Sequence, residues 1–383
     1  MNTKLFLAFG ALLFFVTSPI FASDVVYVVN SYVHNSPLLD WSTVDMLDGD
    51  DLSIMDTVSV GAGAHSVAVS PNGREIWVTC TRDNMISVID AYNLDILRNI
   101  DLGDVDYHPM GIAFTPDGNH VYVTFESMGR IGVFVADTYE LLSTIFVGDD
   151  PGYVLFTPDG RKAYVVNVQN PQVTVIRTSD SSVIATLDFG GVALQDAIVS
   201  PRGDRVYVSN MDQNQIEVIR TSDDTILAPI HTTQIHPRGI SISSDGNYLF
   251  VGHYLGYDST VNMLRLSDNR VVFSAEIPSN PRRIVLGSEG DRIYVSEHND
   301  DECYAFNVAG ESLTFASVVD LNTVSGFNAS PVGLAIRKTL EIPRLILLED
   351  PHIYQPLPEQ PPTLKPELDL PFPSAKQPLK LIK

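Results

Sequence analysis

The sequence predicts an all-β fold, a seven-bladed β-propeller of four-stranded blades, from a recurring turn, from the strands around that turn, and from partial repeats at both chain ends. The turn has the form Ser/Thr-Pro-Asx-Gly, in which proline sets φ and glycine supplies a positive φ. Its copies, some of them looser, close at Gly73, Gly118, Gly160, Gly203, Gly246 and Gly290. The spacings of 45, 42, 43, 43 and 44 residues are typical of propeller blades.

Each turn lies between two predicted strands. A short apolar segment such as residues 111–114 precedes it, and a strand rich in β-branched and aromatic residues, such as residues 121–124, follows it. A third strand is clear at residues 216–219, and a short fourth strand at residues 142–145. Four strands in each repeat, with no helical periodicity between them, form the unit of a propeller.

The two ends of the repeat region each hold part of a blade. Residues 330–336 match a first strand that no second strand follows, whereas residues 25–30 match a second strand that lacks a first. We predict that residues 52–56 supply the third strand of this blade. The N-terminal strands are therefore expected to pair with the last strand and to close a ring that spans residues 24–338.

Two segments lie outside this ring. Residues 1–22 have the features of a secretory signal peptide, with Lys4 before an apolar run and Ala22 before a cut. The run is too short to span a bilayer comfortably, so we expect an exported protein (periplasmic, secreted or at the cell surface) with no membrane segment after signal removal; a retained anchor is the alternative. Residues 339–383 are rich in proline, which favours extended structure. We expect a loose C-terminal extension there, with a docking arm as the alternative.

The second strands carry a recurring tetrapeptide. Tyr27-Val28-Val29-Asn30, Tyr164-Val165-Val166-Asn167 and Tyr207-Val208-Ser209-Asn210 resemble the motif of the YVTN-type β-propeller repeat family, and the preceding turns fit it too. The resemblance covers residues 24–338 and implies the propeller fold. Proteins of this kind include surface-layer repeats, periplasmic binding propellers, lactonase-like enzymes and electron-transfer subunits, so the resemblance does not select a function.

Charge and cysteine content exclude several classes of function. The chain carries 24 Lys and Arg against 47 Asp and Glu, a formal charge of −23. Such a surface repels phosphate backbones, and we expect no nucleic-acid partner. Two cysteines are too few for a disulfide framework or a cysteine-ligated zinc site. Because Cys80 and Cys303 fall in non-adjacent blades, both are expected to be free, half-buried thiols.

Histidines gather on one predicted rim, on loops that enter first strands or join second to third strands. These residues are His34, His65, His108, His236, His253 and His298. Neutral imidazole together with carboxylate suits a divalent cation such as zinc, copper or manganese. We expect such a cation among His236, His253, Glu297 and His298, or around His34, His65 and His108. The alternative is that these histidines only pack and form hydrogen bonds.

Three arginines belong to the same loops. Arg238, Arg282 and Arg283 favour capture of a carboxylate or phosphate group, unless they pair with neighbouring acidic residues. Together with His65 and His108 they are the candidate ligand-binding residues. A separate acidic group, which we place in a long loop, could bind calcium, but it lacks the EF-hand spacing, so a solvated insertion is the alternative. Its members are Asp45, Asp48, Asp50 and Asp51.

The sequence contains no nucleophile elbow, P-loop, dinucleotide-binding motif or haem-attachment motif. We therefore expect an exported, non-enzymatic propeller that binds a small ligand, a cation or a protein partner at its loop-rich rim. One alternative is a metal-dependent lactonase-like hydrolase or lyase that uses His236, Glu297 and His298 as metal ligands or general base. Another is a structural or surface-assembly protein.

Overall fold

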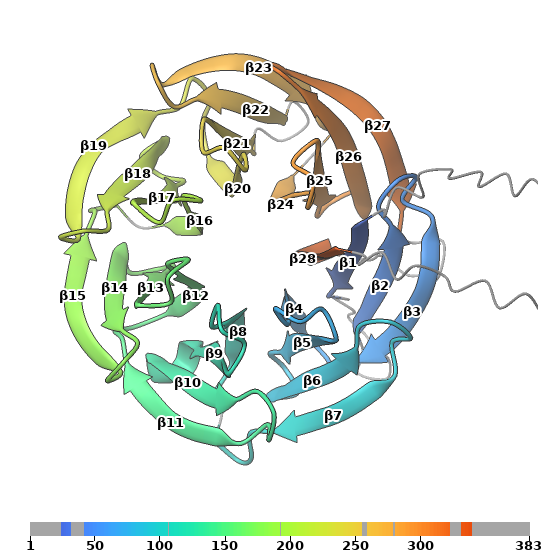
Figure 1. The fold of residues 1–383 in the computed structure, drawn as a ribbon, viewed down its shortest axis with the longest axis vertical. Coiled ribbons are helices and arrows are strands. Elements are labelled where there is room, and N and C mark those ends of the chain that lie inside the picture. The colour runs from blue at the N-terminus through green and yellow to red at the C-terminus, as the bar shows by residue number, and fades with distance from the viewer. Residues whose placement is uncertain are drawn as a thin grey trace, which may run out of the picture. The chain divides into compact units, whose positions relative to one another are not determined.

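Seven antiparallel sheets stand around a central axis as the blades of a propeller (Figure 1). The computed structural model describes residues 24–31, 42–105, 107–191, 193–254, 259–278, 280–321 and 331–338. Each blade has four strands, so the predicted fold is confirmed. We call the sheet β28-β1-β2-β3 blade 1, and the sheets β4–β7 to β24–β27 blades 2 to 7 in chain order. The predicted signal peptide, His34 and the proline-rich extension lie outside the described residues.

Strands occupy equivalent positions in every blade, from the axis outward. The innermost strands are β28 (Pro331–Lys338), β4 (Ala64–Val69), β8 (Pro109–Phe114), β12 (Pro151–Phe156), β16 (Leu194–Val199), β20 (Pro237–Ile242) and β24 (Pro281–Leu286). The second strands are β1 (Asp24–Asn30), β5 (Glu75–Cys80), β9 (His120–Phe125), β13 (Lys162–Asn167), β17 (Arg205–Asn210), β21 (Tyr248–His253) and β25 (Arg292–Glu297). The third strands are β2 (Ser42–Asp48), β6 (Met85–Asp90), β10 (Arg130–Val135), β14 (Gln172–Arg177), β18 (Gln215–Arg220), β22 (Thr260–Arg265) and β26 (Glu302–Ala309). The outer strands are β3 (Ile54–Val60), β7 (Ile96–Asp101), β11 (Leu141–Phe146), β15 (Ser182–Asp188), β19 (Thr225–His231), β23 (Arg270–Glu276) and β27 (Ser312–Asp320).

Blade 1 closes the ring as predicted. Strand β1 pairs with β2 on one side and with the C-terminal strand β28 on the other, where Tyr27 lies opposite Ala335. The last strand of the ring is thereby held by the first, and β1 lies inside the sheet between β28 and β2. Among the described residues, helical structure is limited to the 3-10 turn η1 (Glu126–Met128), and no helix is long and apolar enough to cross a membrane.

The prediction for the third strand of blade 1 was wrong. The third strand is β2, and residues 54–60 form the outer strand instead. Asp45 is a buried member of β2, bonded to Asn30 (2.7 Å) and Thr57 (2.7 Å), and burial raises its pKa to about 6. The other acidic residues form a tight turn rather than a long loop, because Asp48 and Asp51 accept backbone N–H groups two residues ahead. Strand β2 was not predicted because Asp45 interrupts its run of apolar residues.

The hydrophobic core lies between the blades. Each second strand places an aromatic ring there, and Tyr27, Trp77, Tyr164 and Tyr294 are almost completely buried. Trp77 of blade 2 meets Phe114 and Phe134 of blade 3 edge-on, with ring centroids 5.8 and 6.3 Å apart. Burial of such rings at every interface joins the sheets into one rigid body of blades.

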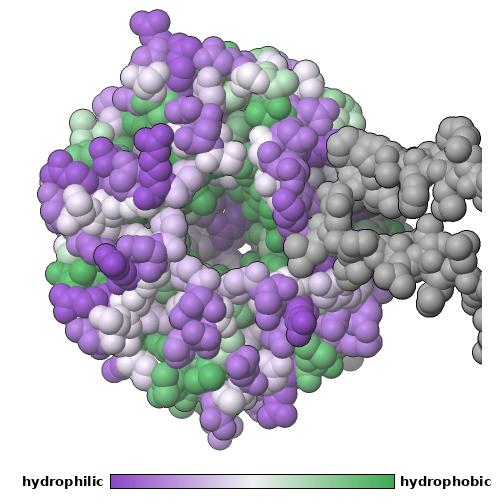
Figure 2. All heavy atoms as spheres, in the orientation of Figure 1, coloured by the Kyte–Doolittle hydropathy of each residue, from purple (hydrophilic) through white to green (hydrophobic). Residues whose placement is uncertain are grey.

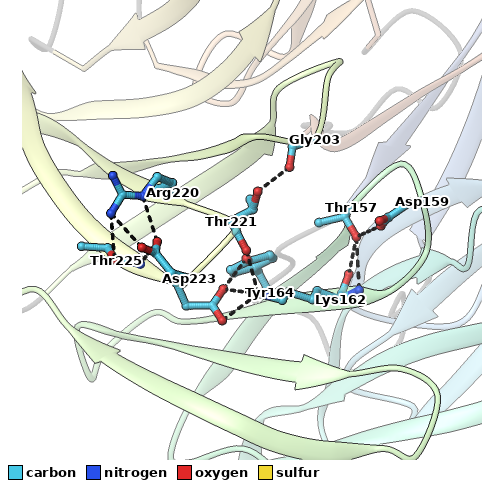
Figure 3. Close-up of polar contacts among 10 residues, drawn as sticks. Thr157, Asp159, Lys162, Tyr164, Gly203, Arg220, Thr221, Asp223 and Thr225 are labelled. Carbon is cyan, nitrogen blue, oxygen red and sulfur yellow. Dashed lines mark hydrogen bonds and ion pairs between the residues drawn. The ribbon is translucent and has the colours of Figure 1, made fainter.

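Polar contacts also join neighbouring blades, on the face that carries the Pro-Asx-Gly turns. In blade 4, Lys162 and Tyr164 project from β13 toward the turn between β18 and β19 of blade 5 (Figure 3). Asp224 in that turn accepts a hydrogen bond from Tyr164 (2.7 Å) and pairs with Lys162 (2.7 Å). Lys162 also donates to the carbonyl of Thr221 (2.7 Å). We call these three side chains, Lys162, Tyr164 and Asp224, the blade 4/5 clamp.

Both cysteines are free, as predicted, and both are buried. Cys80 ends β5 of blade 2 and Cys303 lies in β26 of blade 7, with blade 1 between them. The expected half-burial was wrong, because each residue is fully inaccessible. Burial raises the pKa of the two thiols to about 11 and about 12, which leaves them protonated and unreactive.

Candidate functional site

A channel enters the ring at its centre, where Figure 2 shows a hollow between the blades. The innermost strands surround a cavity of about 210 Å³ on this axis. Each of these strands starts at the face opposite the Pro-Asx-Gly turns, because neighbouring strands of a blade are antiparallel. We call this end of the channel the mouth.

Every innermost strand has a β-bulge one or two residues after its start. The register shifts after Ala64 in β4, after Pro237 in β20 and after Pro281 in β24, and it shifts at the same place in the other blades. A bulge leaves residues unpaired and re-aims their side chains. The predicted ligand residues His65, Arg238 and Arg282 all lie in these bulges, at the same position in blades 2, 6 and 7.

Two of the bulges approach each other too closely for a side chain. At Gly239 of β20, a Cβ atom would stand 2.9 Å from the carbonyl oxygen of Arg282 and 3.0 Å from the Cα of Arg283. Real Cβ atoms do not tolerate such contacts with backbone, so glycine lets β24 pack against β20 here. This packing sets the place of both arginines in the mouth.

One arginine of the mouth is neutralised. Arg283 forms a close ion pair with Asp196 of blade 5, and its guanidinium lies 4.1 Å from the ring centroid of Tyr153 of blade 4. Asp196 also accepts the backbone N–H groups of Ala197 (2.9 Å) and Ile240 (3.2 Å). The His65 ring of blade 2 stacks on the Tyr153 ring, with the ring centroids 6.3 Å apart. Arg283 is thus held by contacts with residues of blades 4 and 5.

The other two arginines have no such partner. The ion pairs among the described residues include neither Arg238 nor Arg282, although both are half-buried. Arg238 lies over the ring of Tyr254 (5.0 Å) and donates to Asn280 (3.1 Å), while its buried Nε has no hydrogen-bond partner. Burial lowers the pKa of Arg238, and the charge of Arg282 adds to this effect.

Burial keeps His65 and His298 of the mouth neutral. Burial lowers the pKa of His65 to about 3, and Arg282 and Arg283 contribute to the shift. Burial likewise lowers the pKa of His298 to about 4, with Arg282 and Arg238 as further causes. Arg282 therefore stands close enough to act on residues of blades 2, 6 and 7 at once. The mouth carries three guanidinium groups, of which only Arg283 pairs with a carboxylate, in a chain of net charge −23.

Unsatisfied buried polar atoms concentrate at this end of the molecule. Among the described residues nine buried side-chain nitrogen or oxygen atoms have no hydrogen-bond partner. Most belong to residues where second strands end, or to residues just beside those ends: Asn30, Asn167, Arg238, His253, Ser296 and His298. Such atoms are rare in native proteins and indicate a place where water or a ligand completes the bonding.

The predicted metal ligands Glu297 and His253 lie at the ends of strands in different blades. Glu297 ends β25 fully buried, and its carboxylate accepts the backbone N–H groups of Asn280 (2.6 Å), Asn299 (2.9 Å) and Asp300 (2.5 Å). His253 ends β21 at the equivalent position, and burial lowers its pKa to about 4. Asn30, Asn167 and Asn210 take the same position in blades 1, 4 and 5. No group of three or more His, Cys, Asp and Glu residues in the described part of the chain is arranged to hold a metal ion.

His236 and His108 have a backbone role. Both adopt a positive φ of 52° immediately before the proline that starts an innermost strand. Histidine is among the residues that adopt this conformation more readily than most. The carbonyl groups of His236 and His108 accept the N–H groups of Tyr254 (3.1 Å) and Glu126 (3.2 Å), and the His108 ring pairs closely with Glu126. The structure therefore places His65, His298 and the three arginines together in the mouth, and His108 beside them.

Three residues of the mouth were not predicted from the sequence: Tyr153, Tyr254 and Asn280. Asp196 was expected on this rim as a carboxylate, but not as the partner of Arg283. Tyr153 and Asp196 take the position in β12 and β16 that Arg283 takes in β24, two residues after the start of the strand. An alignment of the seven innermost strands by their turns would have found these two residues. Tyr254 and Asn280 lie in connecting loops of blades 6 and 7, for which the repeat offers no signal.

Comparisons with known proteins agree with this architecture. A family model described as "Lactonase, 7-bladed beta-propeller" matches residues 138–269, about a third of the chain. No curated protein matches the sequence significantly.

Several solved structures share the fold. Hydrazine synthase from Kuenenia stuttgartiensis aligns with a TM-score of 0.62 and 18% identity, over 73% of this chain and 99% of that one. A functionally unknown protein from Desulfotomaculum acetoxidans aligns with a TM-score of 0.64 and 16% identity, over 81% and 98% of the two chains. Virginiamycin B lyase from Staphylococcus aureus aligns with a TM-score of 0.56 and 18% identity, over 66% and 83%. At these identities the likeness extends to the fold alone, and the chain is a seven-bladed β-propeller whose central part matches the lactonase propeller model.

Proposed function

We propose that this protein is an exported, non-enzymatic propeller that binds a small ligand with a carboxylate or phosphate group in its channel mouth. The observation that carries the proposal is the unpaired state of Arg238 and Arg282 beside the neutralised Arg283. A guanidinium removed from water without a counter-charge costs free energy, which a bound anion would recover.

The contrast with the opposite face supports this interpretation. There, several lysine and arginine side chains are paired with carboxylates, as in Arg220–Asp223 and Arg265–Asp268, both within 2.9 Å. In the mouth, by contrast, Arg238 and Arg282 are half-buried and have no carboxylate partner among the described residues. The flat face of the Arg238 guanidinium lies over the ring of Tyr254, which leaves N–H groups at its edge for a ligand.

Binding of small anions by calorimetry tests the proposal. Succinate and inorganic phosphate are the probes, with wild type, Arg282→Gln and the control Arg202→Gln, which removes the same charge from an exposed position at the opposite face. We expect Arg282→Gln to raise Kd roughly tenfold or more, because a charge-assisted hydrogen bond is lost, and Arg202→Gln to leave Kd unchanged. Failure of both anions to bind, or equal effects of the two substitutions, would overturn the proposal.

Export is a separate part of the proposal and rests on residues 1–22. Mass spectrometry of the protein from its native cells would give the N-terminus of the mature chain. A chain that begins near Ser23 is expected, whereas an intact Met1 or Asn2 terminus would contradict export by signal cleavage.

A further inference from the structure

A second cavity lies on the opposite face, between blades 3 and 4. Its volume is about 680 Å³. The walls are two consecutive Pro-Asx-Gly turns, the start of β9, the outer strand β11, and the turn between β14 and β15. The lining includes Asp117, His120, Leu142, Asp159 and Ser181. We call this cavity the blade 3/4 groove.

The blade 3/4 groove lies at the position that corresponds to the clamp at the blade 4/5 interface. His120 is the first residue of β9, as Lys162 is of β13, and Tyr122 corresponds to Tyr164. Ser181 corresponds to Asp224, since both have a positive φ, of 57° and 56°, in the turn before the outer strand. The cavity at the blade 4/5 interface is only about 280 Å³.

The blade 4/5 clamp shows which chemistry this place accepts. The Lys162 ammonium lies between the carbonyl oxygen of Thr221 (2.7 Å) and the two carboxylate oxygens of Asp224 (2.9 and 2.7 Å) (Figure 3). In the groove the shorter Ser181 and the imidazole of His120 replace these side chains. An ammonium-sized space is thereby left open on a homologous framework.

The groove walls favour a cation over an anion. Two carboxylates, Asp117 and Asp159, belong to its lining, and no lysine or arginine does. Asp159 has an exposed ion pair with Arg161 outside the lining, at 3.6 Å, so Asp117 is the carboxylate without a basic partner. The groove also has an apolar edge, formed by Leu142, Pro116 and Pro158. Leu142 is 62% exposed. The formal charge of −23 raises the local concentration of cations around the whole molecule.

We propose that the blade 3/4 groove binds a primary alkylammonium ligand, with the ammonium near Asp117 and Asp159 and the methylene chain against Leu142. The proposal is independent of the anion site, which lies on the opposite face of the ring, in the channel mouth. Diffusible amines such as polyamines and the lysine side chain of another molecule share this chemistry.

Calorimetry on the full-length protein tests this assignment. Butylammonium and 1,4-diaminobutane are the ligands, and 1-butanol and tetramethylammonium are the controls for the apolar chain and for charge without N–H donors. Binding of both amines with weaker or no binding of the controls is expected. Equal binding of 1-butanol, or no binding of either amine, would overturn the proposal. A lysine-containing peptide that binds far more tightly than 1,4-diaminobutane would identify a protein side chain as the source of the ammonium.

Matched variants locate the site. Asp117 accepts hydrogen bonds from Thr115 (2.6 Å) and Asn119 (3.0 and 2.8 Å), and Asp245 of blade 6 makes the same bonds to Ser243 (2.6 Å) and Asn247 (2.9 and 2.7 Å). Asp117→Asn and Asp245→Asn should therefore disturb their turns equally. We expect only Asp117→Asn to weaken amine binding, roughly three- to fivefold for a partly exposed pair, and Ser181→Asp to strengthen it. Equal effects of the two Asp→Asn changes would show that only the overall charge matters.

Discussion

The blade 4/5 clamp provides a test of how neighbouring blades are held together. The change Asp224→Asn keeps the shape of the side chain and removes its charge. The Asp224 side chain is 11% exposed and that of Lys162 is 22% exposed, so solvent screens this pair only in part. The substitution leaves the Lys162 ammonium with no carboxylate partner. It then has only the neutral amide of the new asparagine and the Thr221 carbonyl beside it.

The expected loss follows from the bonds that change. Asp224 accepts one bond from Tyr164 and is paired with Lys162, and hydrogen bonds to charged groups contribute about 1.5–3 kcal/mol each. Asparagine retains a neutral bond to Tyr164, worth about 1 kcal/mol. After partial screening by solvent, we expect the free energy of unfolding to fall by about 2–4 kcal/mol. For a protein of this size that is a decrease in Tm of about 3–6 °C.

The neighbouring residue supplies a matched control. Asp223 pairs with Arg220 at 2.8 Å, but these side chains are 50% and 41% exposed. Because solvent screens such pairs, Asp223→Asn should melt within about 1 °C of wild type. Thermal unfolding followed by circular dichroism measures both variants. Equal shifts in the two variants, or a shift below about 1 °C for Asp224→Asn, would refute the argument that burial makes this pair structural.

Two further predictions concern the buried groups near the mouth. The pKa values of His65, His253 and His298 are lowered in the folded state, so the unfolded chain binds more protons below the ordinary histidine value of about 6.5. The free energy of unfolding should therefore fall as pH decreases from about 6.5 toward about 4. Urea unfolding at several pH values should show this fall, and less of it in His253→Asn; an unchanged slope would contradict the assignment. Glu297→Gln should lower the unfolding free energy by about 1.5–3 kcal/mol, because a carboxylate that accepts three backbone N–H groups loses its charge. Elemental analysis should find the same divalent-cation content in Glu297→Gln and wild type, and a stoichiometric metal lost from the variant would restore the metal hypothesis.

The repeat made much of the fold predictable from sequence. Proline and glycine at fixed positions set turns such as that ending at Gly118, and the alternation in strands such as β9 follows directly from local chemistry. The pairing of β1 with β28 was predictable because each end lacked what the other supplied. Strand β2 was missed because its buried Asp45 imitates the composition of a loop.

Local sequence thus determined which residues form blades and which end of a strand faces the mouth. It also placed His65, Arg238 and Arg282 on one rim. Only the tertiary structure decided that Asp196 neutralises Arg283 while Arg238 and Arg282 have no such carboxylate, and that Glu297 satisfies backbone groups. These properties depend on distances between different blades and on the burial of each group, and residue spacing along the chain carries neither.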